Sequence, residues 1–116
     1  WNSNFPINSL NIMRGYISVS KDKQNDYLNC FFDAYWKDNY DLSNFENISK
    51  LIKELKIDSE EFFHSIKEQS VKDQLIKLTT DAFEKEVFGT PTFIVNNKIF
   101  WGQDRLEYAL EEINSN

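Results

Sequence analysis

Cysteine, histidine, proline and glycine are all scarce in this sequence. A single cysteine forms no internal disulfide and no Cys-x-x-Cys motif, which fits a reducing compartment, so we expect a cytoplasmic protein. The one histidine excludes a zinc site built from several histidines. No apolar run approaches the roughly 18 residues of a membrane span, and no signal-peptide pattern is visible. We therefore expect neither a metal nor a membrane as a partner.

The charge balance is acidic, with 13 Lys and Arg residues against 19 Asp and Glu residues and a net charge of −6. Nucleic acids and anionic membranes bind basic surfaces, so we expect no nucleic-acid partner. The chain has 116 residues, of which 41% are hydrophobic and 16% aromatic. That composition is typical of one folded domain, or of part of one, with a modest core filled mainly by Phe.

Most of the chain predicts short helices, because apolar residues recur at helical spacing. The predicted helices cover residues 9–19, 20–38, 43–55, 58–66 and 70–83, and a last helix follows Gly102. Their predicted start signals are Ser20, Ser43 with Glu46, Asp58 with Glu61, and Ser70. Gly89 is a predicted helix stop, since glycine accepts the left-handed conformation that ends helices.

Between these helices the pattern changes to two short strands, at 92–95 and 98–101. Asn96 and Asn97 separate them, and because Asn tolerates positive φ we predict a two-residue hairpin turn. A lone hairpin is only marginally stable in water. We therefore expect further strands to complete this sheet, either from residues before Trp1 or from other chains.

The dipeptide Thr90-Pro91 stands just before the first strand. A cis proline there would form a tight turn and aim the Thr90 N–H and C=O outward, where an extended ligand peptide can pair with them. The alternative is a trans proline that only starts an edge strand.

A second polar group, Gly102-Gln103-Asp104-Arg105, stands where a strand ends and a helix is predicted to begin. Free backbone N–H groups at a helix start favour a carboxylate, and Asp104 can receive an ammonium group. A ligand end with both charges, as in an amino acid, would match. The alternative is that Asp104 only caps the helix, with Glu107 completing a capping box.

Taken together, F-G-T-P-T-F-I-V followed by F-W-G-Q-D-R-L resembles the C-terminal signature of 2-hydroxychromene-2-carboxylate isomerases. These are bacterial relatives of kappa-class glutathione transferases with a DsbA-like thioredoxin fold. F-P-I-N-S-L-N-I-M-R and F-F-D-A-Y-W also resemble the helical region of that family. The resemblance implies an α/β, thioredoxin-like fold with an inserted helical domain at residues 1–69. Residues 70–116 would form the C-terminal half of the thioredoxin-like domain, so this chain is expected to be mostly α with one hairpin and a final helix.

The resemblance also implies a glutathione site. Thr90, just before a cis Pro91, would pair its backbone with the cysteinyl part of glutathione, and Gln103 and Asp104 would hold the γ-glutamyl end. Asn8 and Arg14 match positions in the substrate-side region. Their alternatives are a turn or helix cap for Asn8 and a solvated charge for Arg14.

Members of that family begin with a strand, a helix and a second strand, and a hydroxyl residue at the start of that helix stabilises the glutathione thiolate. The 116 residues from Trp1 onward contain no such segment, so the catalytic residue is expected upstream of residue 1. Two further residues are expected to carry no chemistry: Cys30 as a buried structural thiol, and His64 in a satisfied or surface position.

The leading hypothesis is an enzyme, a glutathione-dependent isomerase of small aromatic substrates or a kappa-type glutathione transferase. This chain would supply the glutathione clamp and a helical lid. One alternative is a DsbA-like disulfide oxidoreductase, which needs a Cys-x-x-Cys upstream of residue 1. Another is a non-catalytic helical fragment that associates through its apolar hairpin edge, for which we expect a homodimer.

Overall fold

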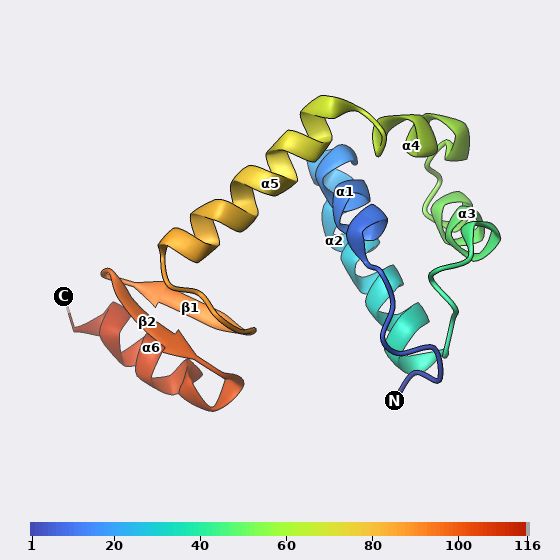
Figure 1. Ribbon diagram of the computed structural model, residues 1–116. Helices are drawn as coiled ribbons and strands as arrows, with labels where there is room; N and C mark the ends of the chain where they lie inside the picture. The colour runs from blue at the N-terminus through green and yellow to red at the C-terminus, as the bar shows by residue number, and fades with distance from the viewer. Residues whose placement is uncertain (116) are drawn as a thin grey trace. The chain divides into compact units, whose positions relative to one another are not determined.

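A computed structural model of the chain describes residues 1–115. The chain forms two compact units, a helical unit from Trp1 to Ile76 and a hairpin unit from Lys77 onward (Figure 1). The predicted domain boundary, between residues 69 and 70, falls at the start of helix α5 (Gln69–Glu84), which contributes residues to both units. The division into domains stays a prediction.

The helical unit consists of short helices that each overlap a stretch predicted from apolar spacing. They are α1 (Leu10–Ser18), α2 (Lys21–Phe32), the π-helix η1 (Asp33–Lys37), α3 (Phe45–Glu54), α4 (Ser59–Ser65) and the first part of α5. The end of the predicted helix at 20–38 is wound more loosely than an α-helix, with the Asp38 N–H bonded to the Asp33 carbonyl at 2.9 Å. No helix within residues 1–115 combines the length and apolar character needed to cross a membrane.

The core of the helical unit is aromatic and aliphatic, and its buried residues come from α2, η1, α3 and α4 and from the segments that follow η1 and α4. The Tyr27 ring stacks on Phe31 with centroids 4.3 Å apart, and its hydroxyl donates to the Ile12 carbonyl at 2.7 Å. Gly15 lies directly against this core, because a Cβ there would collide with the Tyr27 hydroxyl and the Phe62 ring. The absence of a side chain at Gly15 therefore lets α1 approach α2 and α4 closely.

The buried Asn2 fixes the N-terminal segment. Its side-chain amide donates to the Tyr35 carbonyl at 2.7 Å and to the Tyr40 carbonyl at 2.9 Å. Its own amide oxygen accepts from the Asn4 N–H at 2.7 Å. A buried amide whose groups are all bonded stabilises one conformation, so residues before α1 are held against η1.

The predicted helix caps are confirmed at only one helix. The Asp58 carboxylate accepts the Glu61 N–H at 2.8 Å at the start of α4. The Ser43 prediction is wrong, because Ser43 bonds to Asp41 and the Asn44 side chain caps α3 by accepting the Glu46 N–H.

The other two predicted serines differ, because Ser20 marks its helix start correctly and Ser70 does not. Ser20 occupies the N-cap position of α2 but makes no side-chain cap bond. Ser70 lies inside α5, because helical bonding already starts at the Glu68 carbonyl, which accepts from Lys72 at 3.2 Å. Hydroxyl residues thus mark helix starts only to within a residue or two.

The predicted helix stop at Gly89 is also wrong. Helix α5 ends earlier, with Glu86 in the left-handed conformation at φ 61°. The Glu86 N–H bonds to the Phe83 carbonyl and the Val87 N–H to the Ala82 carbonyl, which is the Schellman arrangement. Gly89 has another role, because a Cβ there would collide with the indole nitrogen of Trp101.

The hairpin unit contains the end of α5, strands β1 (Thr92–Val95) and β2 (Lys98–Trp101), the 3-10 turn η2 (Gln103–Arg105) and helix α6 (Leu106–Asn114). The strands are antiparallel, with Thr92 opposite Trp101 and Val95 opposite Lys98. Asn96 and Asn97 have φ of 50° and 61°, so the predicted two-residue turn is confirmed.

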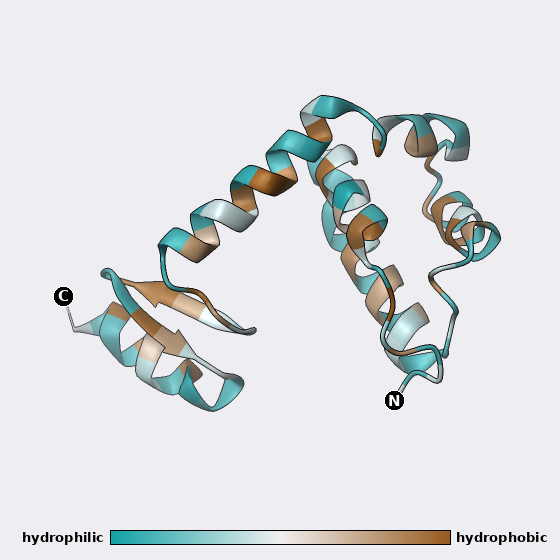
Figure 2. Ribbon diagram, viewed as in Figure 1, coloured by the Kyte–Doolittle hydropathy of each residue, from teal (hydrophilic) through white to brown (hydrophobic). Residues whose placement is uncertain are grey.

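The two faces of the hairpin differ. Phe93 and Phe100 lie opposite each other on the face toward α6, where Lys98 also reaches Glu112. The other face carries exposed Ile94 and Ile99. Hydrophobic residues line both strands (Figure 2). The sheet of residues 1–115 has these two strands, and the expected additional strands stay a prediction.

Candidate functional site

The predicted site residues of the hairpin unit lie at one end of the hairpin. The Gly102 N–H donates to the Pro91 carbonyl at 2.9 Å, which joins the start of β1 to the end of β2. Gly102 has a φ of 101°, a conformation that favours glycine, and a Cβ there would also press on the Asp104 carboxylate. A hollow of about 390 Å³ results, lined by Thr90, Pro91, Trp101, Gly102, Gln103, Asp104 and Arg105. The structure thus brings Thr90, Pro91, Gln103 and Asp104 together.

Thr90 lines this hollow. The Thr90–Pro91 peptide bond is cis, and Thr90 is exposed. Within the described part of the chain, neither its N–H nor its C=O has a hydrogen-bond partner. The hydroxyl of Thr92 donates to the Gly89 carbonyl, so that side chain is already used. An extended peptide in the hollow can therefore bond to the Thr90 backbone.

Gln103 and Asp104 supply the polar side chains. Both are exposed in η2, and no capping bond from the Asp104 carboxylate to η2 or α6 is found among residues 1–115. The alternative of a capping box with Glu107 is therefore wrong. The helix proper starts only at Leu106, because the chain first makes a 3-10 turn after Gly102. An amide and a carboxylate side by side can bind a ligand that carries both an acceptor and a cation.

Trp101 and Arg105 also line the hollow, and neither was predicted as a ligand-binding residue. The Trp101 ring packs on Phe88 with centroids 5.1 Å apart and on the bare backbone of Gly89. Arg105 lies with its guanidinium 5.6 Å from the centroid of the Tyr108 ring. Their positions on either side of Gly102-Gln103-Asp104 could have marked them.

Asn8 and Arg14 belong to the helical unit. The Asn8 side chain accepts the Leu10 N–H at 3.1 Å, which is the turn role that we kept as its alternative. Arg14 is half-buried, and its Nε is buried with no hydrogen-bond partner in the residues that the structure describes. That buried donor does not fit the alternative of a fully solvated charge.

Cys30 and His64 lie away from the predicted site residues in sequence and carry no evident chemistry. Cys30 is half-buried against the helical core, and burial, followed by the charges of Glu54 and Asp33, raises the pKa of its thiol. A raised pKa disfavours the reactive thiolate. His64 is exposed, with Nδ1 3.4 Å from Glu68. Over residues 1–115, no group of three His, Cys, Asp or Glu side chains is arranged to hold a metal.

A helical segment followed by a hairpin and a final helix, with a cis proline beside a peptide-sized hollow, is the arrangement of a thioredoxin-like protein. The family model described as the DSBA-like thioredoxin domain matches residues 1–114. The chain therefore belongs to the DSBA-like thioredoxin domain family. The predicted fold class, mostly α in this chain with one C-terminal hairpin, is confirmed.

Three curated relatives are named 2-hydroxychromene-2-carboxylate isomerase. The protein of Pseudomonas putida is 29% identical over 92 residues, covering 78% of this chain and 45% of the relative. That of Pseudomonas sp. (strain C18) is 30% identical over 92 residues, covering 78% and 43%. That of Sphingobium xenophagum is 22% identical over 88 residues, covering 76% and 45%. The chain thus spans less than half the length of these relatives, and the resemblance read from its motifs is confirmed.

A solved structure of 2-hydroxychromene-2-carboxylate isomerase matches with a TM-score of 0.82 and 23% identity, over 98% of this chain and 56% of that one. At this identity the match establishes the fold alone.

Proposed function

We propose that this chain is part of a glutathione-dependent isomerase of small aromatic substrates, of the 2-hydroxychromene-2-carboxylate isomerase type. A kappa-type glutathione transferase would use the same half-site. The names of the curated relatives support the isomerase class. In this proposal the chain contributes the glutathione clamp and the helical lid, and the thiolate-stabilising group is assigned to none of its residues.

The observation that carries the proposal is the hollow between Thr90 and Asp104. Glutathione is an extended peptide whose γ-glutamyl end carries both an ammonium and a carboxylate. The unpaired N–H and C=O of Thr90 suit its cysteinyl backbone. The Asp104 carboxylate suits the ammonium, and the Gln103 amide can donate to the carboxylate.

Glutathione, when bound, would supply the thiolate nucleophile of the isomerisation. The residues of this chain orient that cofactor, because contacts at both Thr90 and Asp104 fix the direction of the peptide between them. Arg14 is proposed to face the substrate, because it matches a position of the substrate-side region in the family and a guanidinium can pair with an anionic aromatic compound.

The proposal is tested by titrating the chain with glutathione and following amide shifts by NMR. We expect shifts concentrated at Thr90, Gln103 and Asp104. The dipeptide Cys-Gly, which lacks the γ-glutamyl end, should still shift Thr90 but leave Asp104 unchanged.

Matched variants assign the ammonium contact. Asp104→Asn keeps the shape of the side chain but removes its charge, so it should weaken glutathione binding by about tenfold, the usual loss for a charge-assisted bond. Glu107→Gln removes a charge outside the hollow and should bind as the wild type does. Equal binding by both variants, or no shift with millimolar glutathione, would overturn the clamp.

A further inference from the structure

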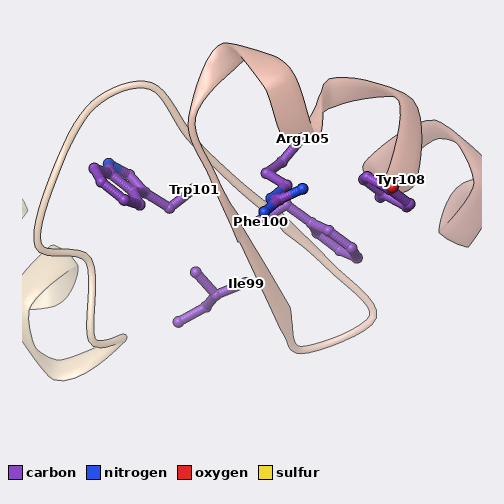
Figure 3. Close-up of a pocket in the computed structure, with 5 residues that line it drawn as sticks. All are labelled: Ile99, Phe100, Trp101, Arg105 and Tyr108. Atoms are coloured by element: carbon purple, nitrogen blue, oxygen red, sulfur yellow. The ribbon is translucent and has the colours of Figure 1, made fainter.

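The hairpin unit contains a second hollow, of about 470 Å³, lined by residues of β2, η2 and α6: Ile99, Phe100, Trp101, Arg105 and Tyr108. Figure 3 shows Ile99 and Trp101 on one side of the strand, and Phe100 and Tyr108 on the other. Sites for small molecules have volumes of this order and combine an apolar lining with a few polar groups. Arg105 is the charged residue among the apolar and aromatic ones here.

This hollow adjoins the proposed glutathione half-site but is made by a different set of contacts. Trp101 and Arg105 line both hollows. The proposed contacts with glutathione come from Thr90, Gln103 and Asp104, and none of these three residues lines the second hollow. Arg105 can therefore serve a different ligand.

Arg105 is a cation without a matching anion. Its side chain is exposed, and no carboxylate within residues 1–115 lies at ion-pair distance from it. Its guanidinium lies 5.6 Å from the centroid of the Tyr108 ring, and this cation–π contact uses none of its five N–H donors. These donors suit a carboxylate, which a guanidinium binds through two parallel hydrogen bonds.

The aromatic rings near Arg105 favour a flat ligand. Tyr108 is 53% exposed and Trp101 52% exposed, so much of each ring can still be covered. Phe100 is half-buried and lies on the same side of β2 as Tyr108 (Figure 3). Aromatic groups stack on such rings or meet them edge to face, which stabilises a complex beyond the area that it buries. A flat anion gains from the rings and from the guanidinium together.

We propose that this hollow is a second ligand site, which binds a small aromatic carboxylate. Arg105 binds the carboxylate, and the rings of Phe100 and Tyr108 contact the flat apolar part. The chain has a net charge of −6, so the attraction for an anion depends on this local guanidinium. The site uses neither the glutathione contacts nor the substrate-side residues Asn8 and Arg14, which belong to the helical unit.

Titration of the chain with 2-naphthoate, followed by amide shifts in NMR and without glutathione, tests the proposal. Saturable shifts should concentrate at Phe100, Trp101, Arg105 and Tyr108, with a Kd in the millimolar range that suits a small ligand at an open site. 2-Naphthamide has the same flat shape without the charge and should bind about tenfold more weakly. Decalin-2-carboxylate has the charge without a flat ring and should bind about threefold more weakly.

Matched variants assign the two contacts. Arg105→Gln removes the charge and should weaken binding of 2-naphthoate by about tenfold, while binding of 2-naphthamide stays as it is. Lys85→Gln removes an exposed positive charge outside the hollow and should bind 2-naphthoate as the wild type does. Tyr108→Phe keeps the ring and should bind normally, whereas Tyr108→Leu should bind more weakly. Hairpin amide shifts verify that each variant folds.

Three results would overturn the proposal. They are the absence of saturable shifts at millimolar 2-naphthoate, equal binding of 2-naphthoate and 2-naphthamide, and equal effects of Arg105→Gln and Lys85→Gln. Binding that weakens as the chain concentration rises would also overturn it, because a second copy would then cover the hollow. Glutathione is absent from every titration, so the outcome does not depend on whether the glutathione clamp exists.

Discussion

At the scale of single residues, each glycine of this chain stands where a side chain would not fit or would be strained. Gly15 and Gly89 each stand where a Cβ would meet an aromatic side chain, and Gly102 has a positive φ. The sequence shows that glycine is scarce. It does not show which side chain packs against Gly15 or Gly89, because those side chains belong to residues distant along the chain. Tyr27 and Trp101 are the partners that only the structure identifies.

Gly15→Ala should destabilise the helical unit. The added methyl group overlaps the Tyr27 hydroxyl and the Phe62 ring, both in a close-packed core, and overpacking of this kind costs about 1–3 kcal/mol. Urea unfolding followed by circular dichroism measures the change in the free energy of unfolding. Met13→Ala, at an exposed position of the same helix, is the control and should change it by less. A neutral Gly15→Ala variant would mean that α1 does not lie this close to α2 and α4.

Cys30 should react slowly with iodoacetamide, because burial raises the pKa of its thiol and the thiolate is the reactive form. The pH at which the rate is half-maximal should lie higher in the folded chain than in urea. A raised folded pKa means that the protonated thiol contributes stability below the unfolded pKa, and this contribution is lost as pH rises through the folded pKa. A half-maximal pH below that of the chain in urea would restore a redox role for Cys30.

At the scale of elements, helix caps offer a direct comparison between the sequence pattern and the structure. Asp58 and Ser70 both looked like caps, but only the Asp58 carboxylate bonds to a free N–H. Asp58→Ala should therefore reduce the free energy of unfolding by about 1 kcal/mol. Ser70→Ala, inside α5, should be neutral or slightly stabilising, since alanine is the better helix former. Chemical denaturation of both variants checks the pair, and equal losses would contradict the observed start of α5.

Element types and the ends of both strands were predictable, but several helix ends were not. The helices could be predicted from the spacing of apolar residues. The hairpin could be predicted from the two Asn residues of its turn, Asn96 and Asn97, because both tolerate positive φ. The starting residues of α3 and α5 depend on which of several neighbouring polar groups bonds to the free backbone N–H groups of the first turn. Asn44 outcompetes Ser43 because the Ser43 hydroxyl is bonded to Asp41. Thr90 and Asp104 were foreseen from motifs, whereas Trp101 joined the site through a contact with Gly89 that no local pattern predicts.

At the scale of the whole molecule, burial is divided unevenly between the two units. Almost every buried apolar residue belongs to the helical unit, and the cluster from Tyr27 to Ile66 forms its core. In the described part of the hairpin unit, Ala109 is the one apolar residue that reaches this degree of burial. The proposed glutathione half-site lies in the unit with little core of its own. Ligands and partners are therefore expected to contribute to its stability.

Native-state hydrogen exchange should reveal this difference. Amides of α2 and α3 are bonded above a buried core and should exchange only through large openings of the helical unit. Amides of Phe93 and Phe100, although bonded within the hairpin, should exchange faster, because the face formed by Ile94 and Ile99 is exposed to water.

Adding glutathione should slow exchange at Thr90, whose N–H gains a partner in the proposed clamp, and leave Ile94 unchanged. Uniform protection across both units would show that the hairpin unit is stabilised by contacts beyond its own buried residues.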